Sequence, residues 1–259
     1  MASIHPTAIV DARATIHETV KIGPYSHIDA DVSIGEGTVI EDYARIFSGT
    51  RLGRFNHVFQ HTTLGAPPQD LSFDPAIITR VHIGDNNCIR EYASIHRSTN
   101  PDKPTTIGDN NLLMAYSHVA HDCQIGDSNI LANAATLGGH VQIDHHAFLS
   151  GHVAVHQFCR VGAYSMISGL SSTTQDVPPY LLADGHRATI VGLNVVGLRR
   201  AGFSQDQRSL IKHAYKILYK SNLSLQSAID ELRKDNASDE VQKIVQFVEG
   251  SERGILSHR

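Results

Sequence analysis

An aliphatic residue stands at every sixth position through two long stretches of this chain, residues 4–64 and 107–167. The residue four places after each aliphatic is small or of modest size, as at Cys123 and Ala135. An amphipathic helix would repeat every 3.6 residues, so a period of six excludes helices here. Hexapeptide periodicity is typical of a parallel β-helix, in which three hexads form one triangular coil. We therefore expect the aliphatic residues inside, the small residues at the corners, and residues about 18 apart stacked on one another.

Two segments interrupt the six-residue register. The first, residues 65–80, contains three prolines, and the register resumes at Ile83. The second, residues 101–106, places a proline where an aliphatic residue is due, yet Ile107 follows Ile95 by two whole hexads, so the register survives. Both segments are predicted to project from the β-helix as loops, where binding and catalytic residues concentrate.

Glycine follows the aliphatic residue at Gly23, Gly35 and Gly53. We expect tight corners at these positions, because glycine adopts backbone conformations that other residues avoid.

The periodicity ends after Ser172, and Pro178 and Pro179 follow closely. Neither proline can donate to a β-ladder, so the segment around them indicates a change of architecture. The sequence thus predicts a mainly β protein with two domains. Residues 1–176 form the β-helix with projecting loops near 65–80 and 101–106, and residues 177–259 form a C-terminal helical domain.

Helical signals fill the C-terminal part. Ser204 and Gln207 are spaced as a capping box at the start of a helix. Further helices are predicted over about Ser224 to Lys234 and Ser238 to Gly250. The first of these helices should bury one apolar face, made of Leu210, Ile211, Ala214, Ile217 and Leu218.

Charge and hydropathy exclude several classes of protein. The formal net charge is −4, and the basic residues are scattered, so no basic stripe for a nucleic acid is present. No run of about 18 apolar residues suits a membrane span, and the first residues lack the pattern of a secretion signal. We therefore expect a cytoplasmic protein.

Histidines gather in the second repeat stretch. His121 and His140 are separated by one coil plus one residue, so their side chains should be neighbours. His156 follows His121 by nearly two coils, and so does His152 after His118, which predicts one seam of imidazoles. A single outward histidine usually serves solubility, but a cluster favours a site. Asp122 would orient the His121 ring only if a corner turned it back, since adjacent strand residues face opposite ways.

Four segments carry a resemblance to a known family: His118-Val119-Ala120-His121-Asp122-Cys123, Ala154-Val155-His156-Gln157-Phe158-Cys159, Gln69-Asp70-Leu71 and Gln175-Asp176-Val177-Pro178-Pro179-Tyr180. Together they resemble the UDP-N-acetylglucosamine acyltransferases that begin lipid A synthesis. Hexapeptide repeats alone would be weak evidence, because many acyltransferases share them. The resemblance spans essentially the whole chain.

The resemblance implies a left-handed β-helix and a homotrimer with active sites between subunits. It implies transfer of a 3-hydroxyacyl chain from acyl carrier protein to position 3 of the sugar of UDP-N-acetylglucosamine, without a metal or other cofactor. His121 matches the general base, and a neutral imidazole can accept the proton of an attacking sugar hydroxyl. Gly139 matches the backbone N–H donor to the oxyanion.

Further family positions lie near the sugar, the nucleotide or the acyl chain. The substrate-binding candidates are Gln69, Asp70, His118, Asp122, His140, His156, Gln157, Asn194 and Arg200. Gly169 matches the position that closes the acyl groove. The absence of a side chain there predicts an open groove and a long acyl chain.

Three positions depart from the usual family pattern. Ser72 stands where a lysine is common, Val196 where an acidic residue is usual, and Ala201 where a second basic residue is common. All three concern the acceptor side. They leave open a 3-amino analogue of the sugar nucleotide as the acceptor, because some family members acylate that compound.

Two other functions remain open at the level of the sequence. A different hexapeptide-repeat transferase would take acetyl-CoA as its donor. A γ-type carbonic anhydrase also uses a trimeric β-helix and binds zinc through three histidines, so a metal assay would separate it from an acyltransferase.

Overall fold

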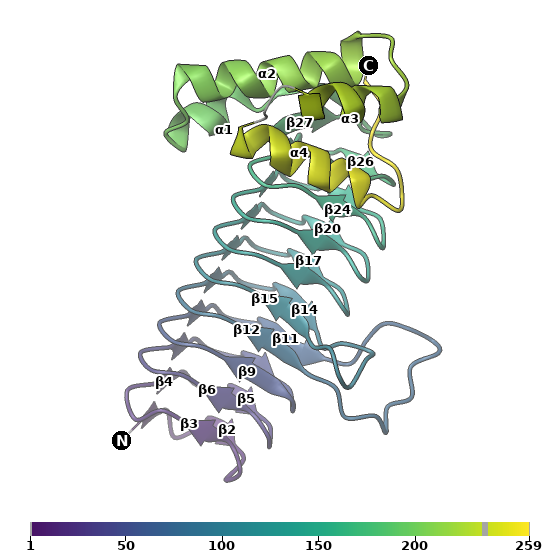
Figure 1. The fold of residues 1–259 in the computed structure, drawn as a ribbon. Helices are drawn as coiled ribbons and strands as arrows, with labels where there is room; N and C mark the ends of the chain where they lie inside the picture. The colour runs from purple at the N-terminus through teal and green to yellow at the C-terminus, as the bar shows by residue number, and fades with distance from the viewer. Residues whose placement is uncertain (1, 235–237, 259) are drawn as a thin grey trace.

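The fold class predicted from the hexapeptide repeats is confirmed by the computed structural model, which describes residues 2–234 and 238–258. Three parallel sheets of 11, 9 and 8 strands form the sides of a triangular prism, and the helices cover the end farthest from the N-terminus (Figure 1). We call these sheets A, B and C, in the order in which the chain visits them. The predicted aliphatic residues lie inside, and Val58, Leu113 and Leu137 are completely buried.

The strands are short because the chain turns a corner after each of them. Sheet A contains β1 (Ser3–Ile4), β4 (Lys21–Ile22), β7 (Val39–Ile40), β10 (His57–Val58), β13 (Cys88–Ile89), β16 (Leu112–Leu113), β19 (Ile130–Leu131), β22 (Phe148–Leu149), β25 (Met166–Ile167), β27 (Leu181–Asp184) and β28 (Thr189–Leu193). Sheet B contains β2 (Ile9–Val10), β5 (His27–Ile28), β8 (Arg45–Ile46), β11 (Thr63–Ala66), β14 (Ser94–His96), β17 (His118–Val119), β20 (Thr136–Leu137), β23 (Ala154–Val155) and β26 (Ser172–Thr173). Sheet C contains β3 (Thr15–Ile16), β6 (Ser33–Ile34), β9 (Thr50–Leu52), β12 (Val81–Ile83), β15 (Thr105–Ile107), β18 (Gln124–Ile125), β21 (Gln142–Ile143) and β24 (Arg160–Val161).

The three edges of the prism are named by the sheets they join: corners AB, BC and CA. A residue with left-handed φ makes the bend at most turns, for example Tyr116 at corner AB, His140 at corner BC and Asn110 at corner CA. The glycines that follow aliphatic residues do not have this role. At Gly35 a Cβ atom would come within 2.7 Å of the backbone of Gly53 in the next coil. The corners expected at these glycines are present, but close stacking of the coils, and not a left-handed backbone, is what requires glycine there.

Both predicted loops project from the β-helix at corner BC, on the right in Figure 1. Beyond them, stacked residues are three hexads apart, as where Leu113 pairs with Leu131. Across the second loop, however, Ile83 pairs with Ile107, which lies four hexads later. The six-residue register continues there because one whole hexad is extruded from the coil as part of the loop. Pro101 belongs to this hexad, so it does not point into the core.

The predicted helices are present: α2 (Gln205–Lys220), α3 (Leu225–Lys234) and α4 (Asp239–Glu249). Both hydrogen bonds of the capping box form between Ser204 and Gln207. Of the predicted apolar face, Ile211 and Ala214 are buried, Ile217 and Leu218 are partly buried, and Leu210 is 43% exposed. This face packs against α3 and α4.

Residues 177–259 are predicted to form a helical domain, but two strands come before its first helix. Strand β27 continues sheet A beside β25, and β28 returns antiparallel to it before the short helix α1 (Val195–Arg200). Val177 also bridges to Val161, so the chain stays stacked on the coils beyond residue 176. The division into domains at residue 176 stays a prediction of the sequence pattern. Among the described residues, no helix is long and apolar enough to cross a membrane.

Candidate active site

A short histidine–carboxylate contact lies at corner BC, between β17 and β18. Nδ1 of His121 is 2.7 Å from Oδ2 of Asp122. Adjacent residues face the same way here because Asp122 has a φ of +61°, which turns its side chain back toward the ring. The corner geometry that the sequence analysis required is therefore present. Since the carboxylate accepts from Nδ1–H, the ring presents its unprotonated Nε2 outward.

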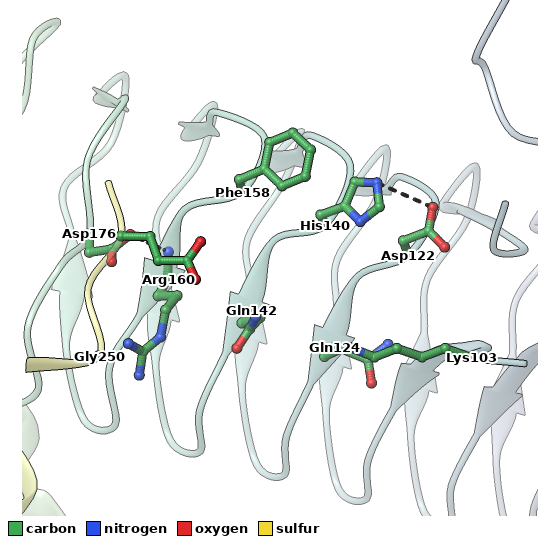
Figure 2. Close-up of a pocket in the computed structure, with 10 residues that line it drawn as sticks. Lys103, Asp122, Gln124, His140, Gln142, Phe158, Arg160, Asp176 and Gly250 are labelled. Carbon is green, nitrogen blue, oxygen red and sulfur yellow. Dashed lines mark hydrogen bonds and ion pairs between the residues drawn. The ribbon is translucent and has the colours of Figure 1, made fainter. Parts of the chain in front are cut away.

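His140 lies beside this pair, one coil further along, as its spacing predicted. Its ring centroid is 5.4 Å from that of His121, at right angles, and its Nε2 is 3.5 Å from Oδ2 of Asp122. Figure 2 shows His140 facing Asp122, with the ring of Phe158 on its other side. Burial lowers the pKa of His140, although the charge of Asp122 acts in the opposite direction. A neutral imidazole at this position is therefore favoured.

The Asp122 carboxylate is nearly inaccessible to solvent, with 7% of the residue exposed. Burial by itself raises the pKa of the carboxyl, but hydrogen bonds from His121 and Thr99 outweigh it, so the net shift is downward. Thr99 donates from its backbone N–H at 3.0 Å and from its hydroxyl at 2.8 Å. Asp122 is therefore an ionised, fully hydrogen-bonded group beneath the His121 ring.

Gly139 packs directly against the face of the His121 ring. A Cβ atom built at Gly139 would lie 2.6 Å from Cε1 and 2.9 Å from Nε2 of that ring. Gly139 is the second residue of its turn at corner BC. Among the described residues its backbone N–H has no acceptor, and the same is true of His121 and Gln157, which have the equivalent place in the neighbouring coils. Gly139 is buried against the His121 ring, so its unpaired N–H belongs to a backbone that lies next to this imidazole, where acyl transfer needs an oxyanion donor.

His118 lies on the outer face of sheet B, next to this corner. Its Nδ1 is 2.7 Å from Oγ of Ser94, and its ring meets the ring of His96 edge-on. Burial lowers the pKa of His118 and brings that of His96 to about 4, with the neighbouring imidazoles adding to both shifts. The sequence did not single out Ser94 or His96. Both lie in β14, one coil before the histidine segment, which is the only signal that could have found them.

Asp70 reaches the same neighbourhood from the first projecting loop. Its Oδ1 accepts hydrogen bonds of 2.8 Å from both the N–H and the hydroxyl of Ser72. These bonds lower the pKa of Asp70, and the charges of His121 and His140 act in the same direction. Gln69 precedes it with an exposed side chain. The loop therefore brings a carboxylate toward the histidine pair.

His156 and Gln157 occupy corner BC one coil beyond Gly139 and His140, and both are exposed. Nδ1 of His156 contacts the carbonyl oxygen of Gln157 at 3.0 Å. His152, in contrast, lies at corner AB, where its N–H donates to the carbonyl of Asn133. The prediction of a single histidine seam is therefore wrong for His152.

Asn194 and Arg200 are not brought to the histidines within one chain. They line a pocket of about 730 Å³ at corner CA, the other edge of sheet C, together with Tyr164. Asn194 caps α1: its Oδ1 accepts from Gly197 N–H at 3.0 Å, and its Nδ2 donates to the Tyr164 carbonyl at 2.9 Å. Val196 and Ala201, two of the three departures from the family pattern, line the same pocket.

Gly169 also lies away from the histidines, at corner AB across sheet B. Its φ is not left-handed, and the nearest atom to a Cβ built there would be the Gly151 carbonyl oxygen, at 3.4 Å. A side chain is therefore sterically possible at Gly169. The outward side chains of sheet B between the two corners are small, at Thr136, Ala154 and Ser172.

Several side chains that the sequence analysis did not consider extend the site along sheet C. A cavity of about 280 Å³ runs from Asp122 and His140 toward the helices (Figure 2). Gln124, Gln142 and Arg160 stand in one row along it, because their strands pair in register. Only a three-dimensional stack brings these residues together, since nothing in their local sequence is distinctive.

His121, Asp122 and His140 are close enough to share a metal ion, with ligand atoms within 4.8 Å of one another. Oδ2 of Asp122, however, already accepts hydrogen bonds from His121 and Thr99. The Asp122 carboxylate is thus already supplied with donors by the protein itself. We assign no metal to it.

Sequence comparisons relate this chain to known proteins. The model of the hexapeptide-repeat bacterial transferases matches residues 2–48 and 104–139, and the model of UDP-N-acetylglucosamine O-acyltransferase domain 2 matches residues 176–256. A relative from Janthinobacterium, named acyl-[acyl-carrier-protein]–UDP-N-acetylglucosamine O-acyltransferase, is 46% identical over 99% of this chain and 100% of its own length.

Solved structures give the same result. The UDP-N-acetylglucosamine acyltransferase of Francisella novicida superimposes with a TM-score of 0.96 at 38% identity, covering 98% of this chain and 94% of that one. LpxA from Acinetobacter baumannii superimposes with a TM-score of 0.94 at 42% identity, covering 98% and 99%. This chain therefore belongs to the UDP-N-acetylglucosamine O-acyltransferase family and is an acyltransferase.

Proposed function

We propose that this protein transfers a 3-hydroxyacyl chain from acyl carrier protein to position 3 of the sugar of UDP-N-acetylglucosamine, the first step of lipid A synthesis. The observation that carries the proposal is Nε2 of His121, which the contact between Nδ1 and Asp122 leaves free, beside Gly139, whose N–H has no acceptor among the described residues. A base and an oxyanion donor side by side are what acyl transfer to an alcohol requires.

The reaction follows from these two groups. Nε2 of His121 takes the proton of the sugar hydroxyl while the oxygen attacks the thioester carbonyl carbon. The carbonyl oxygen becomes an oxyanion and accepts a hydrogen bond from the Gly139 N–H. At comparable sites such a donor stabilises the transition state by roughly 3 kcal/mol. When the tetrahedral intermediate collapses, the C–S bond breaks, and the thiolate of the carrier takes the proton from His121. Asp122 stabilises the imidazolium in between.

The acceptor side is where this chain differs most from its family, because Ser72, Val196 and Ala201 all depart from the usual pattern. Ser72 supplies no positive charge near Asp70, and the other two line the Arg200 pocket without charge. We propose that the 3-amino analogue is used at least as well as UDP-N-acetylglucosamine. An amine is a better nucleophile than a hydroxyl, so its acylation would depend less on general-base catalysis by His121.

The substrates are tested by incubating the purified protein with 3-hydroxyacyl carrier protein and each nucleotide in turn. Mass spectrometry should find an acylated product, and hydroxylamine should cleave an ester but not an amide. Acetyl-CoA serves as the control donor. Turnover with acetyl-CoA alone would contradict the proposed donor, and a strong preference for the 3-hydroxyl nucleotide would contradict the proposed acceptor.

The proposed chemistry needs no metal ion. Dialysis against a chelator should therefore leave the rate unchanged. Stoichiometric zinc in protein purified without added metal, lost together with activity on chelation, would contradict this and favour a zinc enzyme.

We also propose a homotrimer whose active sites lie between subunits. The support is that Asn194 and Arg200 occupy one edge of sheet C and His121 the other, so one chain alone does not assemble the set. In a closed ring, the CA pocket of one subunit could face corner BC of its neighbour. Arg200 would then bind the nucleotide phosphates as a charge-assisted donor.

Complementation tests the shared site. His121→Ala and Arg200→Ala chains with different tags are co-expressed, and doubly tagged assemblies are purified. In doubly tagged trimers, about a third of the sites should have both residues intact, because each mixed ring holds one complementing boundary. Activity no higher than in either parent assembly would contradict the shared site.

A further inference from the structure

Asp122 has more hydrogen-bond donors than its role beneath His121 requires. Oδ2 accepts from Nδ1 of His121 and from the Thr99 hydroxyl, while Oδ1 accepts from the Thr99 N–H. The backbone N–H of Asp122 in turn donates to Oγ1 of Thr105 at 2.8 Å. Two threonines therefore hold this one residue, one at its carboxylate and the other at its backbone.

Both threonines stand at the extruded hexad of the second projecting loop. Ser98 and Thr105 donate their N–H groups to the same carbonyl, that of Arg80, and so close the base of the loop. The hydroxyl of Ser98 donates to the carbonyl of Asn100 within the loop. The loop is thus an ordered structure, and it places Thr99 over the side chain of Asp122.

No such support exists one coil further along. His140 has the same place at corner BC as Asp122, and its backbone N–H donates to the His121 carbonyl. Within the described residues, no threonine contacts the side chain of His140. We call the contacts of Thr99 and Thr105 with Asp122 the clamp. It is found at the Asp122 coil and is not a general property of corner BC.

Resting on the function proposed above, we propose that Thr99 is a positioning residue that acts through Asp122 on the catalytic His121. With both carboxylate oxygens fixed, Asp122 cannot rotate toward His140, whose Nε2 is only 3.5 Å from Oδ2. Asp122 therefore serves His121, and the His121 ring keeps Nε2 directed outward beside Gly139. A buried carboxylate without such donors would pivot between the two imidazoles.

The clamp also affects protonation. A donor to Oδ2 withdraws charge from the atom that accepts from His121, so losing that donor would strengthen the attraction for an imidazolium. Other groups face this pair: Asp70 from the first loop, His118 and His96 from sheet B, and Lys103 from the second loop. None of them contacts the Asp122 carboxylate. Their influence therefore stays the same when only the Thr99 hydroxyl is changed.

Thr99→Val tests the proposal, because it removes the hydroxyl, keeps the backbone N–H and preserves the side-chain shape. We expect kcat to fall about tenfold with KM nearly unchanged, since a charge-assisted hydrogen bond is lost near the base. The acidic limb of the kcat/KM profile should move toward higher pH. Thr99→Ser, which restores the hydroxyl, should recover both the rate and the position of the limb.

Ser98→Ala is the matched control, because it removes a buried hydroxyl of the same loop that does not touch Asp122. It should lower the melting temperature and leave the limb in place. A wild-type profile for Thr99→Val, or an equal shift in Ser98→Ala, would overturn the positioning role. Should Thr99→Val fail to fold, Thr99→Ala is measured against the same criteria.

Failure of this inference is distinguishable from failure of the proposed function. If His121→Ala is inactive while Thr99→Val behaves as wild type, only the positioning role is overturned. If His121→Ala retains full activity, the proposed base itself is wrong, and so is any role that acts through it.

Discussion

Corners CA and BC of the β-helix differ in whether their polar groups have hydrogen-bond partners. Inside corner CA, four buried asparagines form a ladder at positions 56, 87, 111 and 129. Asn111, for example, accepts from the Asn129 N–H at 2.8 Å and donates to Oδ1 of Asn87 at 3.0 Å. At corner BC, Nε2 of His121 and the N–H of Gly139 have no partner within the described residues.

The difference separates stability from function within one scaffold. A satisfied buried polar ladder fixes the register of the coils, because any slip would leave several groups unpaired. An unsatisfied donor and acceptor side by side cost free energy and persist where a substrate completes them. The asparagine ladder inside corner CA should therefore govern unfolding, and the histidine pair at corner BC should govern turnover.

The largest expected effect is at corner BC. His121→Ala should lower kcat by about 10²-fold or more, since the general base is lost. The fold should be unchanged, as judged by circular dichroism and melting temperature. His17→Ala, at an exposed histidine of the first coils, is the matched control and should retain full activity. Activity of His121→Ala within a few-fold of wild type would remove the distinction between the corners.

The counterpart at corner CA is Asn111→Ala. It leaves the buried Asn129 N–H without an acceptor and removes one of the two donors to Oδ1 of Asn87, so the free energy of unfolding should fall by about 2–4 kcal/mol. Urea titration measures this, with the exposed Asn133→Ala expected to change it by less than about 0.5 kcal/mol. The kcat of folded protein should stay near wild type. A large loss of kcat without a loss of stability would contradict the division.

Corner AB sharpens the comparison, because neither chemistry nor register depends on Gly169. Gly169→Met should shorten the preferred acyl chain, since each methylene that no longer fits forfeits about 0.8 kcal/mol. The fold should tolerate it, because φ is ordinary and the nearest contact of a Cβ is 3.4 Å. Carrier proteins loaded with chains of several lengths are compared on both proteins. An unchanged length profile in a folded, active variant would exclude Gly169 as the limit of the groove.

A smaller expected effect is the pH dependence of the free energy of unfolding, which His96 should contribute and the asparagine ladder should not. Burial, with the charges of His118 and His121, lowers the pKa of His96 to about 4. An unfolded histidine gains its proton near pH 6.5, so stability is complete above that value and is lost as the pH falls toward 4. The slope should be up to about 1.4 kcal/mol per pH unit. The asparagine ladder does not titrate.

His96→Leu should flatten this pH dependence between about pH 6.5 and 4, whatever its effect on absolute stability. Unfolding free energies from urea titrations at several pH values measure the slope. An equal slope in wild type and variant would show that His96 does not supply it.

The fold was predictable because its signal is repetitive and local. The inward residue of each hexad can be read from its position in the repeat. The same spacing predicted that His121 lies beside His140, without any knowledge of long-range contacts. The β27–β28 hairpin was missed because its coil follows two prolines and lacks the six-residue period. A stacked strand can thus continue a β-helix without carrying its sequence signature.

The site was predictable only in part, for a related reason. The register survives the extruded hexad, so counting alone did not reveal that the stacking interval there changes from three hexads to four. Thr99 lies in that extruded hexad, where the 18-residue spacing does not hold, and it was therefore not expected at Asp122. Asn194 and Arg200 were found by resemblance alone, and no spacing rule relates them to the histidines.

The pH dependence of acyl transfer tests the central claim most directly, namely that a free imidazole nitrogen at corner BC does the chemistry. The kcat/KM of wild-type protein is measured from pH 5 to 8, with stability checked at each pH. We predict that kcat/KM falls by about tenfold per pH unit on the acidic side, because only the neutral ring accepts the proton. A flat profile from pH 5 to 8 would contradict the account.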